Sequence, residues 1–145
     1  MARYTAGVRT SAGSTTLPII SLYASASVGC RIFEIGCFNT TTTAAAIMLT
    51  RMTSTGTLGA GLTEAPWDTN SPAASCTAFT THSGNPTLGA DLGYRAPLGA
   101  AIGAGVIWTF GGAGLVILPG VTNGVGILVA TGTGQVCDAY ISFEE

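Results

Sequence analysis

The sequence reads GVIWTF at residues 105–110, GLVIL at 114–118 and VGILV at 125–129, three short apolar runs within one stretch that carries no charge. No Asp, Glu, Lys or Arg lies between Arg95 and Asp138. Short runs rich in β-branched and aromatic residues are typical of antiparallel strands when turn residues close them, and Asn-Gly is a strong hairpin signal. The turn residues here are Gly111-Gly112, Pro119-Gly120, Asn123-Gly124 and Gly132-Thr133-Gly134.

A membrane-spanning helix is the alternative interpretation of this charge-free stretch. Such a helix needs about 20 consecutive, mainly apolar residues, and residues 98–118 have that length. Six glycines interrupt this segment, however, and hairpin signals follow it directly. The pattern therefore favours short strands in a sheet over a helix.

The composition indicates a single domain whose surface packs against other protein subunits. The chain has 145 residues, a length typical of a single domain. Only 8% of them are charged, against about 25% in an average soluble protein, and all five basic residues are Arg. The net charge of −2, with no cluster of Arg, argues against a nucleic-acid partner. A Thr-rich β-domain that remains alone in solution is the plainer alternative.

Further strands are expected at residues 19–25, 31–39, 44–52, 76–83 and 136–143. The alanines at 44–46 also allow a helix, but the Thr-rich flanks favour a strand that forms a hairpin with residues 31–39. Eight or nine short strands separated by regular turns predict an all-β fold, a single antiparallel β-sandwich of jelly-roll type. Residues 1–16 are expected to form an N-terminal arm, and residues 17–145 the sandwich.

The candidate interface residues lie in the arm and in the long irregular segment 54–75. The polar arm carries Arg3 and Arg9, and we expect it to lie on its own sheet or on a neighbouring subunit. Within the irregular segment, Trp67 is followed by Asp68. An exposed Trp serves as an interface anchor or as a platform for sugars, whereas a buried one here would only cap the domain's own core.

No residue pattern points to catalysis, to a metal site or to a cofactor site. Glu34 between Phe33 and Ile35 has two interpretations: an acid or base with a raised pKa, or a carboxylate paired with an Arg such as Arg31 or Arg51, or bound to the backbone of a turn. The second is favoured because no partner group is near in sequence. His82, the only histidine, is interpreted as a polar residue at a strand end. We therefore predict that the protein is not an enzyme and needs no cofactor.

The four cysteines are interpreted as small buried side chains. They are Cys30, Cys37, Cys76 and Cys137, without the short spacing of a structural zinc site. Cys30 and Cys37 are seven residues apart, which places them on opposite faces of an unbroken strand. A disulfide between Cys76 and one of the other cysteines is an alternative that the spacing does not decide.

The segment RIFEIGCFN at residues 31–39, followed by a Thr- and Ala-rich stretch, resembles the opening of small head proteins of tailed bacteriophages. The ending is similar to theirs as well, with Trp108, GLVI at 114–117, NGVG at 123–126 and FEE at 143–145. The resemblance covers most of the chain loosely and rests on fold motifs. It implies a single jelly-roll decoration, or cement, protein: a homotrimer on the outer surface of the capsid that binds the major capsid protein across capsomer joints.

Two other functions are weighed against this one. A receptor- or glycan-binding module of a phage fibre or spike would use Trp67 or Trp108 against sugar rings. A hydrolase would need Glu34 together with Asp68 or Asp91, and nothing in the sequence brings these carboxylates together.

Overall fold

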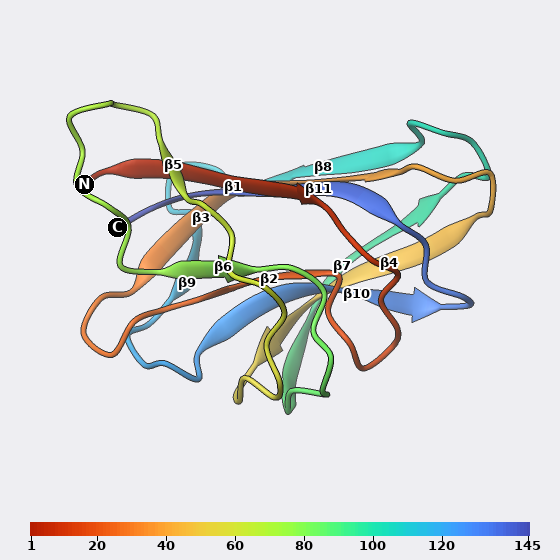
Figure 1. The fold of residues 1–145 in the computed structure, drawn as a ribbon, viewed down its shortest axis with the longest axis horizontal. Helices are drawn as coiled ribbons and strands as arrows, with labels where there is room; N and C mark the ends of the chain where they lie inside the picture. The colour runs from red at the N-terminus through yellow and green to blue at the C-terminus, as the bar shows by residue number, and fades with distance from the viewer.

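The computed structural model describes all residues, 1–145, and contains eleven β-strands and no helix (Figure 1). Residues 98–118, the possible membrane helix, instead contain two of the strands and the turns around them. No helix capable of crossing a membrane is found. The strands are β1 (Arg3–Arg9), β2 (Ile20–Tyr23), β3 (Cys30–Asn39), β4 (Ala45–Met52), β5 (Ala65–Pro66), β6 (Thr77–Phe79), β7 (Leu88–Leu98), β8 (Gly105–Thr109), β9 (Leu115–Ile117), β10 (Gly124–Thr131) and β11 (Cys137–Glu144).

The strands form two antiparallel sheets packed against each other, which confirms the predicted all-β sandwich. Sheet A has the order β5-β1-β11-β3-β8, and β9 also pairs with β3. Sheet B has the order β6-β2-β10-β4-β7. In Figure 1, sheet A is the upper layer and sheet B the lower layer.

The main strands pair in a nested order. The innermost pair is β4 with β7, followed outward by β3 with β8, β2 with β10 and β1 with β11. The short strands β5 and β6 lie in the connection between β4 and β7, and they extend the two sheets at the β1 and β2 edges. Strand β9 continues the line of β8 along β3 after an interruption at residues 110–114.

The core lies between the sheets and follows from side-chain alternation along each strand. In β11, for example, Ile141 and Phe143 are fully buried, whereas the alternate residues face outward. Strand β10 is buried on both faces, because its outer face lies under loops. One continuous apolar cluster therefore joins the two sheets.

A β-bulge in β3 changes which residues face the core. The register passes from Glu34 opposite Ser142 to Ile32 opposite Phe143, so Phe33 is an extra residue. Ile32 and Ile35 are consequently both fully buried. The bulge also places Cys30 and Cys37 on the same inner face, so the prediction of opposite faces is wrong; it assumed an unbroken strand. All four cysteines are buried and free, as expected.

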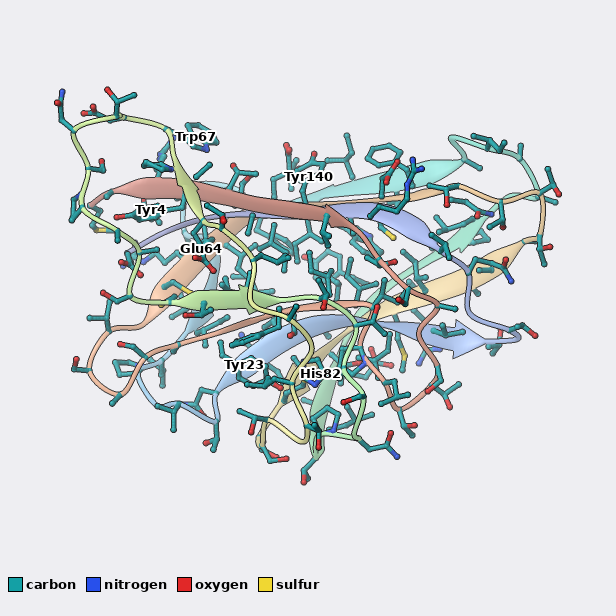
Figure 2. The ribbon with its side chains drawn as sticks, viewed as in Figure 1. Tyr4, Tyr23, Glu64, Trp67, His82 and Tyr140 are labelled. Carbon is teal, nitrogen blue, oxygen red and sulfur yellow. The ribbon has the colours of Figure 1, made fainter.

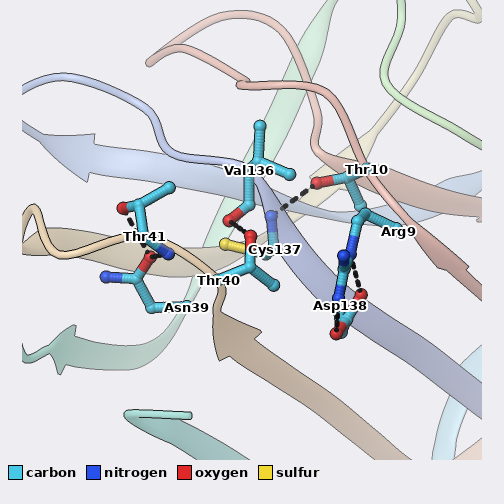
Figure 3. A network of polar contacts seen from close by, with 8 residues as sticks. All are labelled: Arg9, Thr10, Asn39, Thr40, Thr41, Val136, Cys137 and Asp138. Carbon is cyan, nitrogen blue, oxygen red and sulfur yellow. Dashed lines mark hydrogen bonds and ion pairs between the residues drawn. The ribbon is translucent and has the colours of Figure 1, made fainter. Parts of the chain in front are cut away.

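The predicted hairpin between residues 31–39 and 44–52 is wrong, although both segments are strands. Strand β3 belongs to sheet A and β4 to sheet B, so the Thr-rich connection crosses between layers. Asn39 holds this crossing: its amide donates to the carbonyl oxygens of Thr43 (2.7 Å) and Gly99 (3.0 Å), and its Oδ1 accepts from the Thr41 amide. Figure 3 shows Asn39 and Thr41 at this end of the sandwich.

The predicted N-terminal arm is also corrected, because most of it is a strand of the sandwich. Residues 3–9 form β1, which pairs along its whole length with β11, and Tyr4 and Ala6 are fully buried. This segment was expected to lie on its own sheet or on a neighbouring subunit, and in the structure it lies in its own sheet. The division at residue 16 does not separate an arm from the domain, because alternate residues of this polar segment are apolar and complete the core.

The outer face of sheet B is covered by the chain's own loops. Tyr23, Met52 and Leu128 point away from the main core yet are at most 3% exposed. The Tyr23 hydroxyl donates to the Ser54 carbonyl oxygen (3.0 Å), and His82 Nε2 lies 2.8 Å from Ser21 Oγ. Figure 2 shows Tyr23 and His82 on the side of sheet B that faces away from sheet A.

Candidate functional site

The outer face of sheet A carries no covering loop over most of its width. The outward side chains come from alternate positions of β1, β11, β3 and β8, which the register aligns in rows. Ile107 is 51% exposed, the largest exposure among the apolar side chains of β8. We call this surface the open face; its residues are Arg3, Thr5, Arg9, Arg31, Phe33, Glu34, Phe38, Ile107, Thr109, Asp138, Tyr140, Ser142 and Glu144, with Trp67 at its edge.

Trp67 is held over the β1 edge of the open face while most of its ring stays in solvent. Its backbone amide donates to the Arg3 carbonyl oxygen (2.9 Å), and its Nε1 donates to Thr5 Oγ1 (2.8 Å). Its exposed fraction is 61%, so the interpretation as a cap over the core does not hold. Figure 2 shows Trp67 on the side of sheet A away from sheet B.

Arg3 lies between two aromatic rings beside Trp67. Its guanidinium carbon is 4.7 Å from the centre of the Phe33 ring and 5.7 Å from that of Trp67, distances suited to cation–π attraction. Its Nε is 3.5 Å from Glu144 Oε2. The bulge at Phe33 turns that ring outward toward Arg3. This arrangement fixes a cation and two rings in one exposed cluster.

A second feature of the open face is Tyr140, whose ring lies across Gly36. A Cβ atom on Gly36 would come within 2.1 Å of this ring, so only glycine fits there. The Tyr140 hydroxyl donates to Glu34 Oε1 (2.5 Å). Partial burial, followed by this hydrogen bond, raises the pKa of Tyr140 to about 12. The phenol therefore stays protonated and remains a donor to Glu34 at neutral pH.

Glu34 has a partner other than those the sequence suggested. Its hydrogen bond is to Tyr140, and not to Arg31 or Arg51. Arg51 points inward at the end of the sandwich, where its Nη1 donates to the Val116 carbonyl oxygen (2.5 Å). The hydrolase alternative is not supported by this geometry, because Asp68 binds the Asn70 amide in its own turn and Asp91 pairs with Arg95 on β7.

The structure brings together three of the four predicted interface residues. Arg3, Trp67 and Asp68 lie at one corner of the open face. Arg9 is six residues farther along β1, where its Nε and Nη2 bind the two carboxylate oxygens of Asp138 at 2.9 and 2.8 Å (Figure 3). Trp108, the other candidate sugar platform, is 9% exposed and packs edge-on against Tyr94, so it offers no free ring face.

Sequence reasoning missed Phe33 and Tyr140 as members of the site. The alternation of residues 136–143 does set Tyr140 apart from the buried Ile141 and Phe143. Its position over Gly36 depends on how β11 aligns with β3, which no local pattern specifies. Phe33 faces outward only because of the bulge.

A row of residues extends the open face to an apolar end of the molecule. The register aligns Arg3, Glu144, Arg31 and Val116 across the sheet. Val116, Leu118 and Met1 are 41%, 69% and 79% exposed, and they line one shallow cavity of about 220 Å³. We call these three residues the apolar end.

A serine and a histidine meet in the interior, away from solvent. Ser21 and His82 form the one Ser–His contact, but they are 0% and 3% exposed, beneath the loops that cover sheet B. Burial lowers the pKa of His82, which keeps its ring neutral at pH 7. His82 is thus a buried polar residue that follows strand β6. No group of three His, Cys, Asp or Glu side chains is arranged to hold a metal ion.

Comparisons with protein-family models, with curated proteins and with solved structures gave no match.

Proposed function

We propose that this protein is a structural virion protein, a decoration or cement protein that stabilises a phage head by binding across capsomer joints. The observation that carries the proposal is the contrast between a sheet face covered by loops and the open face, which presents Trp67, Arg3 and Phe33. The low charge of the chain and the resemblance of residues 31–39 and 108–145 to phage head proteins support it. The partner would be the major capsid protein, and the location the outer surface of the capsid.

The finer fold assignment belongs to this proposal. We infer a jelly roll because eight strands form two sets of four, β1-β11-β3-β8 and β2-β10-β4-β7. Their nested pairing is what a long antiparallel hairpin gives when it wraps into two layers. The resemblance also implies a homotrimer, so the purified protein should have three times the chain mass of 14.5 kDa in light scattering.

The proposed mechanism is mechanical. The open face and the apolar end would lie across a joint between capsid subunits and bury apolar surface, which contributes roughly 25 cal/mol per Å² before association costs. Opening the shell would then require breaking these contacts at every occupied joint. Aromatic and Arg side chains such as Trp67 and Arg3 usually contribute most of the binding free energy of such an interface.

The test is co-sedimentation with capsids built from the major capsid protein of the same genome. Trp67→Ala and Arg3→Ala should each weaken binding by about thirtyfold, the effect expected of hot-spot residues. The matched controls are Tyr94→Ala and Arg95→Ala, an exposed aromatic and an ion-paired Arg on β7. Failure of the wild-type chain to bind refutes the function. Equal losses from both pairs of variants refute the open face as the docking surface.

Glycan binding by a fibre or spike module is the second candidate, favoured by one observation. The exposed Trp67 ring lies beside the partly exposed hydroxyl of Thr5, 2.8 Å from its Nε1, and sugars are recognised by such a ring with polar groups around it. Binding of the isolated protein to a glycan array, lost in Trp67→Ala, would support this candidate. Capsid binding without any glycan signal would exclude it.

A further inference from the structure

The four cysteines meet in the core as two pairs. Four cysteines allow three pairings, and the fold selects one by placement: Cys76 lies beside the start of β3, where Cys30 stands, and Cys37 and Cys137 lie on adjacent strands. Cys30 begins β3 in sheet A, whereas Cys76 directly precedes β6 in sheet B. Cys76 Sγ also lies 3.5 Å from the carbonyl oxygen of Val28, two residues before Cys30. This first pair therefore spans the two layers of the sandwich.

We propose that Cys30 and Cys76 form a redox-sensitive pair that closes, in oxidising surroundings, into a disulfide joining sheet A to sheet B. With a small-molecule disulfide such as oxidised glutathione as the oxidant, the Cys30 thiolate attacks one sulfur and releases one glutathione thiol. The Cys76 thiolate then displaces the second glutathione. Two protein S–H bonds are lost and one S–S bond forms, while the oxidant's S–S bond is reduced to two thiols.

Access to the surface distinguishes Cys30 from the other three cysteines. The cavity of about 220 Å³ at the apolar end is lined by Cys30, together with Gly29, Pro119 and Glu145. Cys37, Cys76 and Cys137 line none of the five cavities of the molecule. A small oxidant that enters from the surface would therefore reach Cys30 first.

The chemistry of Cys30 makes the reaction slow at neutral pH. The neighbouring Cys76 thiol and burial raise the pKa of Cys30, so little of the reactive thiolate is present. We expect the rate of bridging to rise with pH through the alkaline range. Slow disulfide formation fits a structural disulfide that forms once after synthesis, and does not fit a sensor that responds rapidly.

The second pair serves as an internal control. The register places Cys37 opposite Ala139 and Cys137 opposite Asn39, so the two cysteines are diagonal neighbours on β3 and β11. Diagonal neighbours are about 7–8 Å apart, whereas a disulfide needs Cα atoms about 4.4–6.8 Å apart. We therefore expect Cys37 and Cys137 to remain thiols under conditions that bridge Cys30 and Cys76.

The experiment treats the folded, full-length protein with oxidised glutathione at alkaline pH, blocks the remaining thiols after unfolding, and maps the peptides by mass spectrometry. The expected product has lost two hydrogen atoms, contains a Cys30–Cys76 peptide pair and carries two blocked thiols, at Cys37 and Cys137. Its Tm should rise by about 5–15 °C and return to the starting value on reduction.

Two variants sharpen the result. Cys137→Ser should bridge and gain Tm as the wild type does, whereas Cys76→Ser should show no gain and hold glutathione on Cys30. Peptide mapping of the wild type needs no variant, so the proposal stays testable if Cys76→Ser does not fold. A Cys37–Cys137 bridge as the main product, disulfides only between molecules, or four free thiols after prolonged oxidation would each overturn the proposal, which does not depend on the virion role.

Discussion

The outer faces of the two sheets differ in what covers them. On sheet B, Tyr23 and Met52 are 3% and 2% exposed, because residues 53–64 and 79–87 fold back over the strands. On sheet A, Trp67 and Ile107 are 61% and 51% exposed, and Arg3 and Arg9 form their ion pairs at the surface. One face is thus a second, smaller core, and the other is a surface of rings, hydroxyls and paired charges.

This difference separates stability from recognition. Side chains on the covered face are held by close packing, and removing one of them would leave a cavity. Side chains on the open face are held by hydrogen bonds and stacking to their own sheet, so they can change with little loss of folding free energy. The surface the chain leaves uncovered is therefore where we look for a partner.

The largest expected effect comes from removing one aromatic ring on each face. Tyr23→Ala should lower the free energy of unfolding by about 3–5 kcal/mol, since it leaves a cavity and breaks the hydrogen bond to Ser54. Trp67→Ala, the matched change on the open face, should cost at most about 1 kcal/mol, the worth of one exposed hydrogen bond. Urea unfolding measures both. Equal losses would show that the two faces do not differ as described.

Adding a side chain at Gly36, beneath the Tyr140 ring, should have the next largest effect. Gly36→Ala forces the Tyr140 ring away from the sheet and should cost about 2 kcal/mol, as overpacking does. Reduced burial of the ring, together with the loss of the hydrogen bond to Glu34, should also bring the pKa of Tyr140 down from about 12 toward its usual value. Ultraviolet titration detects this change, and Tyr140→Phe identifies the transition. An unchanged titration would mean that the ring does not depend on Gly36.

Acid should weaken the covered face through His82. Burial lowers the pKa of His82 in the folded protein, so the unfolded chain takes up the proton first, and stability falls as pH drops below about 6.5. The slope is at most about 1.4 kcal/mol per pH unit for one proton. Urea unfolding across this range measures it. His82→Gln should reduce the change of the unfolding free energy with pH. If the variant keeps the full slope, the pH dependence arises from other groups.

The smallest effect is expected on the open face, at the exposed pair of Arg9 and Asp138. Arg9 lowers the pKa of Asp138 through two hydrogen bonds, yet both side chains are in solvent, where such pairs contribute little. A double-mutant cycle with alanine at both positions should give a coupling smaller than any effect above. That coupling should weaken as salt is raised to about 1 M, where the Debye length falls to about 3 Å, close to the distance between the paired atoms. A coupling that does not change with salt would show that this part of the open face is shielded from solvent.

Several elements were predictable from the sequence. Residues 31–39, 44–52 and 136–143 are strands as expected, because alternation and turn residues act over only a few positions. Arg3 and Trp67 were both identified as candidates. That they touch was not predictable, since they are 64 positions apart and meet only through the pairing of β1 with β5.

The errors share one cause. Three expectations assumed that neighbours in sequence decide the partner or the face. They are the hairpin between residues 31–39 and 44–52, the arm at residues 1–16 as a part separate from the sandwich, and the opposite faces of Cys30 and Cys37. Strand partners and bulges depend on the free energy of the whole two-layer arrangement. A segment pairs where its apolar face completes the core, and that place can lie at the far end of the chain.

The sequence by itself determined that the chain is made of short strands, because turn propensity and side-chain alternation are local properties. It also determined a surface poor in charge, because no Lys and few acids are present. Only the tertiary structure decided which face stays open, which rings surround Arg3 and which cysteines meet. These depend on register and layer order, where a shift of one residue moves every side chain of a strand to the other face.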